Sequence, residues 1–256
     1  GKTATTLAHL LTRTGPHLVV CPLSVVRNWE KEAARFAPSL SVHVYHGGDR
    51  ATGDDAPELL SGFDIVITTY GLIARDVESL SQVPWGTLVL DEAQAIKNPH
   101  TKAARSVRKL RASQKLALTG TPIENRLSEL WSILDAVNPG LLGSLVRFQG
   151  EFATPIEKDR DEGAAERLRR LTAPFLLRRT KADKQLLPDL PDKVEQIAWA
   201  SLTKEQASMY QAVVDELLKN AEQERGMRRR GLVLASLTRL KQICNHPAHA
   251  LGDGSR

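Results

Sequence analysis

The sequence predicts an α/β protein with a doubly wound parallel sheet, followed by a mostly helical part. Between His17 and Val137, short apolar segments alternate with amphipathic segments, as strands and helices do in repeated βα units. One of the apolar segments, Asp64–Thr69, is almost continuously apolar, which is typical of a parallel strand buried on both faces. Polar motifs follow several of these segments. Because such sheets bind ligands at the carboxyl ends of their strands, the motifs are candidate site residues.

Each element is expected for a local reason. Residues 2–11 form a helix that ends before the turn sequence Thr14-Gly15-Pro16. Ser24 is a good N-cap for a second helix. The alternating part closes with an amphipathic helix from Leu127 to Val137, which Asn138-Pro139-Gly140 terminates. The other expected elements are strands at residues 17–21, 42–45, 64–69, 88–90 and 115–118, and helices at residues 72–80 and 101–110.

The chain changes character after Gly140, where it becomes mostly helical and strongly charged. We therefore divide it into residues 1–140 and residues 141–256. The elements expected in the second part are exposed helices within 151–171, a segment at 182–192 broken by prolines, a strand at 194–198, a long helix at 203–224 and a last helix that ends at residue 240.

Net charge narrows the choice of partner only weakly. The formal charge is +5 and the pI about 9.3, which mildly favours a polyanionic partner, although an arginine-rich composition explains the charge equally well. We interpret the basic run at residues 225–230 as a solvated helix connection in preference to a DNA contact. No apolar run approaches the roughly 20 residues that span a bilayer, so no membrane partner is expected.

Two cysteines, Cys21 and Cys244, are too few for a disulfide framework or a zinc pattern and indicate a reducing compartment. The chain begins without Met and inside a motif, so we expect it to be a fragment of a longer protein. Its alanine- and arginine-rich composition favours a bacterial source. The expected location is therefore the bacterial cytoplasm, in association with the nucleoid, in preference to a nucleus.

The most informative motif is the acidic pair Asp91-Glu92, which follows the apolar, β-prone segment Thr87–Leu90. Carboxylates at the carboxyl end of a strand can hold Mg²⁺ and orient a water molecule. Asp91 by itself could instead cap a helix. A Glu beside it, followed by Ala93 and Gln94, favours a catalytic role over capping.

Gly1-Lys2-Thr3 matches the end of a phosphate-binding loop and leads into a helix. The tripeptide alone is a weak signal. Combined with the acidic pair, it indicates a nucleoside triphosphatase site that uses ATP and Mg²⁺. Lys2 would bridge the β- and γ-phosphates, while Thr3 and Asp91 would bind Mg²⁺.

The order of motifs along the chain resembles that of the superfamily-two helicases. It is most similar to the Swi/Snf-type ATPases of chromatin remodellers and their bacterial relatives. The resemblance covers almost the whole chain. The segments that carry it are Gly1–Thr3, Val19–Ser24, Val66–Tyr70, Asp91–Gln94, Leu118–Asn125, Glu129–Leu134, Phe175–Lys181 and Leu240–Pro247.

The resemblance implies a RecA-like P-loop lobe at residues 1–140, truncated at its N-terminus. Residues 141–256 would be a helical insertion and helices that lead to a second ATPase lobe, which is absent. The resemblance also implies that Asp91 binds Mg²⁺ and that Glu92 orients the attacking water. Gln94, where many relatives carry His, would couple the site to the other lobe.

Further roles follow from the same resemblance. Thr119, Gly120 and Thr121 match the motif that links nucleotide state to lobe movement. Trp29 lies in a segment that faces nucleic acid in the family, but its place on an apolar helix face favours a core position. The candidate nucleic-acid contacts are Ser24, Thr68, Thr69, Lys97 and Arg126.

The predicted function is that of the first lobe of an ATP-dependent translocase or remodeller of the Swi/Snf type, acting on double-stranded DNA and on proteins bound to it. A second lobe of the same chain would complete the site, so the isolated fragment is expected to be inactive. Two alternatives remain. One is a strand-separating DNA or RNA helicase. The other is a nucleic-acid-binding scaffold with a decayed ATPase, against which the intact Lys2, Thr3, Asp91 and Glu92 argue.

Overall fold

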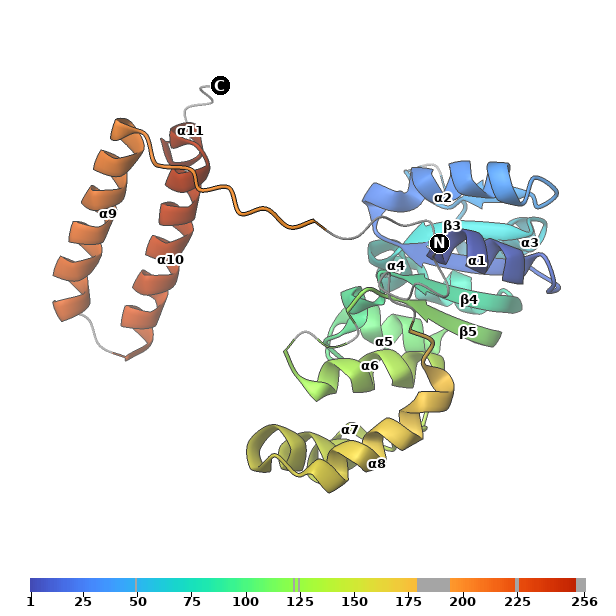
Figure 1. Cartoon of the computed structure of the whole chain (residues 1–256). Coiled ribbons are helices and arrows are strands. Elements are labelled where there is room, and N and C mark those ends of the chain that lie inside the picture. Colours follow the sequence, from blue (N-terminus) through green and yellow to red (C-terminus); the bar gives the residue numbers. More distant parts are fainter. Residues whose placement is uncertain (49, 122, 124, 179–193, 224–225, 252–256) are drawn as a thin grey trace. The chain divides into compact units, whose positions relative to one another are not determined.

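A computed structural model describes residues 1–48, 50–121, 123, 125–178, 194–223 and 226–251 (Figure 1). The chain divides into two compact units, residues 1–178 and 179–256, which are described separately below. Several predicted features lie outside the described residues. They are Pro122 and Glu124 of the motif Leu118–Asn125, Arg179–Lys181, the proline-broken segment at 182–192, and Arg225 of the basic run.

The first unit is built on one parallel sheet, as predicted. Its strands, in the described part of the unit, have the order β2-β3-β1-β4-β5 and all neighbours pair in parallel. On the central strand β1, Val19 lies opposite Ile67 of β3 on one side and Val89 of β4 on the other. The strands are β1 His17–Cys21, β2 Val42–Val44, β3 Ile65–Thr69, β4 Trp85–Asp91 and β5 Ala112–Leu118.

Helices cover both faces of this sheet, which makes it doubly wound (Figure 1). Alternate residues of β1 belong to different cores: Val19 packs under α1 (Lys2–Leu10) and α2 (Leu23–Phe36), whereas Val20 packs on the opposite face. Because both faces are covered, the inner strands β1, β3 and β4 have no polar face, and they appear in the sequence as nearly continuous apolar runs. The opposite face carries α3 Ala56–Ser61, α4 Tyr70–Ser81, α5 Lys102–Lys109 and α6 Leu127–Val137.

The start of α2 differs from the prediction. Ser24 does not cap this helix, because the helix begins at Leu23 and Pro22 occupies the N-cap position. Pro22 has φ −60° and ψ 147°, an extended conformation that suits the residue between a strand and a helix. Ser24 therefore lies in the first helical turn, where its side chain is exposed.

Residues 141–175 pack on the first lobe through α6. Trp131 and Leu134 of α6 share a hydrophobic cluster with Leu142, Phe148 and Phe152. This contact explains why the compact unit extends to Arg178 and does not end at Gly140. The elements of this part are α7 Leu145–Phe148, two π-helical stretches at Gln149–Ala153 and Pro155–Asp159, α8 Glu162–Thr172 and a 3₁₀ turn at Ala173–Phe175.

The second unit contains a helical hairpin, α9 Lys204–Gln223 and α10 Gly226–Asn245, followed by α11 Pro247–Leu251. The predicted strand at 194–198 is wrong: residues 194–203 have no regular structure. A strand needs a neighbour to satisfy its backbone groups, and the described part of this unit offers only helices. No helix in the described residues is both long and apolar enough to cross a bilayer.

Acidification is expected to destabilise the first unit through His17, at the start of β1. This residue is 1% exposed, and neither its Nδ1 nor Oγ1 of the neighbouring Thr87 has a hydrogen-bond partner among the described residues. Burial lowers the pKa of His17, and burial also lowers the pKa of His43. Below about pH 6.5 the unfolded chain therefore binds protons that the folded chain does not, so stability is lost as pH falls.

The measurement is thermal melting of the 256-residue chain at pH 7.5 and 5.5. His17→Leu should remove much of the difference in Tm between the two pH values, whereas His100→Leu, at an exposed position, should leave it unchanged. Equal pH dependence in both variants would contradict the assignment to His17.

Candidate active site

The acidic motif lies where β4 ends, at the carboxyl edge of the sheet. Asp91 is the last residue of β4 and is 9% exposed. Glu92 has φ 50° and ψ 53°, a left-handed conformation that is uncommon outside glycine, and it turns the chain into the 3₁₀ helix Ala93–Ile96. Its backbone N–H donates to Asp91 Oδ1 over 3.0 Å. Strained backbone of this kind is characteristic of functional sites.

A chain of hydrogen bonds joins the acidic motif to the segment after β5. The side-chain amide of Gln94 donates to Glu92 Oε2 over 2.6 Å, and the hydroxyl of Thr119 donates to Gln94 Oε1 over 2.8 Å. The backbone N–H of Thr121 then donates to the Thr119 hydroxyl over 3.2 Å. Two motifs separated in sequence are thus one connected network. Gly120, between the two threonines, lies in the same segment.

Asp91 and Glu92 place two carboxylates side by side in sequence at this edge. Among the described residues, no Lys or Arg forms an ion pair with Asp91 or Glu92. Burial, reinforced by the charge of Asp91, raises the pKa of the neighbouring Cys21 thiol to about 12. The pKa of Tyr70 is also raised, first by burial and then by Asp91. A buried Asp91 beside a half-buried Glu92, neither ion-paired to a Lys or Arg of the described residues, fits a hard divalent cation such as Mg²⁺, which keeps several of its waters and needs few protein ligands.

Lys2 and Thr3 form the first turn of α1, after Gly1. Near the C-terminal end of α1, His9 Nε2 hydrogen-bonds Gln114 Oε1 over 2.6 Å, close to the start of β5. The turn after α1 lies at the start of β4, where the Gly86 N–H donates to the Pro16 carbonyl over 2.7 Å. The helix therefore ends at the amino edge of the sheet and runs back for about 13 Å toward the carboxyl edge.

This direction brings the start of α1 to the edge where Asp91 and Glu92 lie. Neither Lys2 nor Thr3 makes a hydrogen bond or ion pair with the two acidic residues in this structure. The Lys2 side chain is exposed and that of Thr3 is half-buried. Because phosphates often bind at a helix N-terminus, the start of α1 is a candidate phosphate site at this edge.

The loop after the acidic motif is anchored by α6. Ser132 donates its hydroxyl to the Ile96 carbonyl over 2.6 Å. Arg108 of α5 pairs with Asp135 over 2.9 Å, donates to the Ser132 hydroxyl over 3.0 Å, and lies over the Trp131 ring. These contacts join α6, which carries the motif Glu129–Leu134, to the loop that follows the acidic pair.

The candidate nucleic-acid residues differ in exposure. Ser24 and Arg126 are exposed. Lys97 is half-buried and lies 3.9 Å from Glu129. Thr69 is half-buried, and its hydroxyl accepts the Leu72 N–H over 3.4 Å, which caps α4.

Thr68 does not fit its predicted role. It is fully buried, and its hydroxyl donates to the Tyr45 carbonyl over 3.1 Å. The side chain lies inside the lobe because β3 is covered on both faces, and it therefore presents nothing to a nucleic acid.

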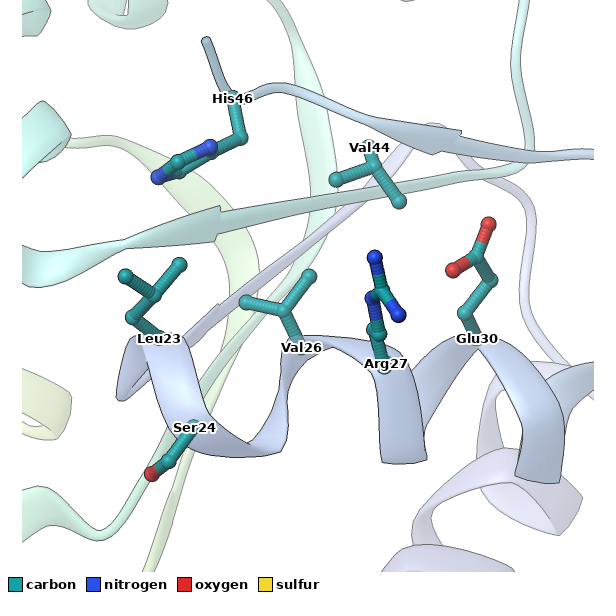
Figure 2. A pocket seen from close by; sticks show the side chains of 7 residues that line it. All are labelled: Leu23, Ser24, Val26, Arg27, Glu30, Val44 and His46. Atoms are coloured by element: carbon teal, nitrogen blue, oxygen red, sulfur yellow. The ribbon is translucent and has the colours of Figure 1, made fainter.

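A cavity of about 530 Å³ lies between α2 and β2 (Figure 2). Arg27 and Glu30 point from α2 toward β2, whereas Ser24 points away from them (Figure 2). The cavity lies beside the exposed first turn of α2 and contains none of the acidic-motif residues. The residues that line it are Leu23, Ser24, Val26, Arg27, Glu30, Val44 and His46.

Comparison with known proteins tests the resemblance that the motifs indicate. The family model of the SNF2-related domain matches residues 1–249. The chain belongs to this SNF2-related family. Its fold is also similar to the SWI2/SNF2 ATPase core of Sulfolobus solfataricus, solved in complex with double-stranded DNA. That match has a TM-score of 0.68 and 45% identity, and covers 100% of this chain and 54% of that one.

Two curated relatives support the same family assignment. A putative ATP-dependent helicase/translocase of Bacillus subtilis, YwqA, is 47% identical over 254 residues, which are 97% of this chain and 28% of that protein. The ATP-dependent DNA helicase DDM1 of Arabidopsis thaliana is 36% identical over 282 residues, 100% of this chain and 36% of that protein. The chain thus spans only about a third of these two curated relatives, and about half of the solved core.

Proposed function

We propose that this chain is the nucleotide-binding lobe of an ATP-dependent translocase or remodeller that acts on double-stranded DNA. The observation that carries the proposal is the hydrogen-bonded chain from Glu92 through Gln94 to Thr119. It connects a candidate water-orienting carboxylate to the motif that follows the next strand. A site built in this way can report the state of a bound nucleotide to the segment that leads into α6.

Lys2, Thr3 and Asp91 are the residues proposed to hold Mg·ATP, with Gly1 beside them. Bound Mg²⁺ would neutralise charge on the phosphates. Glu92 is proposed to orient the attacking water and accept its proton, since its second carboxylate oxygen, Oε1, makes no hydrogen bond to a described residue. Gln94 holds Glu92 in place, and Thr119 holds Gln94.

DNA is proposed to bind through its phosphates at Ser24, Thr69, Lys97 and Arg126, which positions the duplex without reading its sequence. Support comes from the solved SWI2/SNF2 core, which holds double-stranded DNA. A second ATPase lobe and DNA-bound proteins are the other proposed partners. The bacterial cytoplasm, with nucleoid association, stays the predicted location.

The deciding experiment is ATPase stimulation of the full-length protein by duplex DNA, single-stranded DNA and single-stranded RNA of equal length. Stronger stimulation by duplex supports the translocase. Stronger stimulation by either single strand replaces it with the strand-separating helicase, and no stimulation by any of the three favours a scaffold.

Arg126→Gln in the full-length protein is expected to weaken DNA binding equally for all sequences. One lost phosphate contact should reduce the log–log slope of affinity against salt concentration by about 0.9. The measurement is fluorescence anisotropy over a salt series with two unrelated duplexes. Arg170→Gln is the matched control, because Arg170 is also exposed but lies on α8, and this variant should leave the slope unchanged. A change in one duplex only would mean that Arg126 reads bases.

A further inference from the structure

Asp91 is held by two aromatic side chains that come from opposite faces of the sheet. Trp29 of α2 donates its Nε1–H to Asp91 Oδ2 over 2.8 Å. Tyr70, at the start of α4, donates its hydroxyl to the Asp91 backbone carbonyl over 2.8 Å. Trp29 belongs to the core under α1 and α2, and Tyr70 belongs to the core on the other face. Trp29 is 1% exposed and Tyr70 is 9% exposed.

These contacts fix one orientation of the Asp91 carboxylate. Oδ2 accepts the indole N–H, and Oδ1 accepts the backbone N–H of Glu92 over 3.0 Å. An ionised carboxylate has about four lone-pair sites, so each oxygen keeps capacity for a metal ion or a metal-bound water. Since the side chain is already ordered, metal binding does not have to restrict its rotamers.

The indole N–H is therefore more than a satisfied polar atom of the core. Trp29 needs some acceptor because it is buried. The acceptor it has is the one carboxylate of β4 that lies at the proposed Mg²⁺ site. Partners of this kind, which bind a ligand residue and not the metal, typically contribute about 10–100-fold to metal affinity.

We propose that Trp29 is a positioning residue that orients Asp91 for Mg²⁺ binding. The inference rests on the proposed function, because it takes Asp91 as a ligand of Mg²⁺ or of its bound water. Trp29 acts through Asp91 and touches neither the nucleotide nor the attacking water. Tyr70 complements it by fixing the backbone of the same residue.

The test is Trp29→Phe in the full-length protein, which keeps an aromatic ring in the core and removes the N–H donor. Mn²⁺ serves as the spectroscopic probe of the metal site, and its Kd is measured by electron paramagnetic resonance with a saturating non-hydrolysable ATP analogue. The Kd for Mn²⁺ is expected to rise about 10-fold or more. The affinity for the analogue without metal is expected to stay unchanged, which a general loss of structure would not allow.

Trp85→Phe is the matched control. Trp85 is 2% exposed, lies at the opposite end of β4, and donates its Nε1–H to the Leu80 carbonyl over 2.7 Å. This variant loses a buried indole hydrogen bond that has no connection to Asp91, so its Kd for Mn²⁺ should equal that of the wild type.

A similar Kd for Mn²⁺ in Trp29→Phe and Trp85→Phe would overturn the positioning role. If Trp29→Phe does not fold, 3-benzothienylalanine at the same position provides the measurement, because sulfur replaces the N–H in a ring system of the same shape. If the wild-type protein binds the analogue and Mn²⁺ but the variants do not differ, only the positioning role fails. If the wild type binds neither, the proposed function fails with it.

Discussion

Glu92→Gln in the full-length protein is expected to abolish ATP hydrolysis while largely sparing ATP binding. The amide keeps the shape of the side chain and can still accept the hydrogen bond from Gln94, which spans 2.6 Å in the native protein. It cannot accept a proton from the attacking water. Loss of a positioned general base lowers the rate by about 10²–10⁴-fold. DNA-stimulated turnover and equilibrium binding of a fluorescent ATP analogue are measured on the same preparation.

Two further variants serve as a control and a comparison for Glu92→Gln. Glu78→Gln replaces an exposed glutamate of α4 and should leave turnover unchanged. Lys2→Ala should reduce binding and hydrolysis together, because it removes a charge that would neutralise phosphate. Near-normal turnover in Glu92→Gln would assign the base to another residue. A loss of binding as large as that of Lys2→Ala would instead indicate that the substitution disturbs the network.

The isolated 256-residue chain is expected to turn over ATP at least about 10³-fold more slowly than the full-length protein with DNA. Charge develops on the transferred phosphoryl group, and an arginine supplied from elsewhere contributes about 10³–10⁵-fold in related phosphoryl-transfer sites. Among the described residues, Asp91 and Glu92 pair with no arginine. The solved SWI2/SNF2 core has about twice the length of this chain, which covers 54% of it.

The comparison is steady-state turnover at saturating ATP, with duplex DNA in both reactions. Glu92→Gln in the isolated chain sets the background from contaminating ATPases. Addition of the remaining part of the protein as a separate polypeptide should restore part of the rate. Turnover by the isolated chain equal to that of the full-length protein would show that the described lobe contains a complete site.

The sequence was sufficient for the order of the five strands and of α1, α2, α4, α5 and α6 in residues 1–137, but it missed the short helix α3 at Ala56–Ser61. The inner strands β1, β3 and β4 lie between two layers of helices, so they had to be mostly apolar, and the helices that cover them had to be amphipathic. The positions of Asp91, Glu92 and Thr119 at the ends of strands followed from that pattern. Their convergence followed as well, since the carboxyl ends of parallel strands share one edge.

Some features were predicted wrongly or were not predicted, and most of these depend on contacts between distant residues. Pro22 and not Ser24 precedes α2, which is a local error about which residue ends the extended segment. The strand at 194–198 failed because strand formation depends on a partner that this unit does not supply in its described residues. The extension of the compact unit to Arg178 depends on the hydrophobic cluster around Trp131, whose members come from three α-helices, a π-helical stretch and a loop.

The sequence by itself determined the fold class, the motif order and the chemical identity of the acidic site, because these depend on residue type and on spacing along the chain. Only the tertiary structure decided which side chains complete that site. Thr68 and Thr69 are neighbours on one strand, yet Thr68 is buried and Thr69 caps α4. Trp29 reaches Asp91 across 62 residues of sequence. Such contacts depend on how helices pack across a sheet face, and no local pattern of residues specifies that packing.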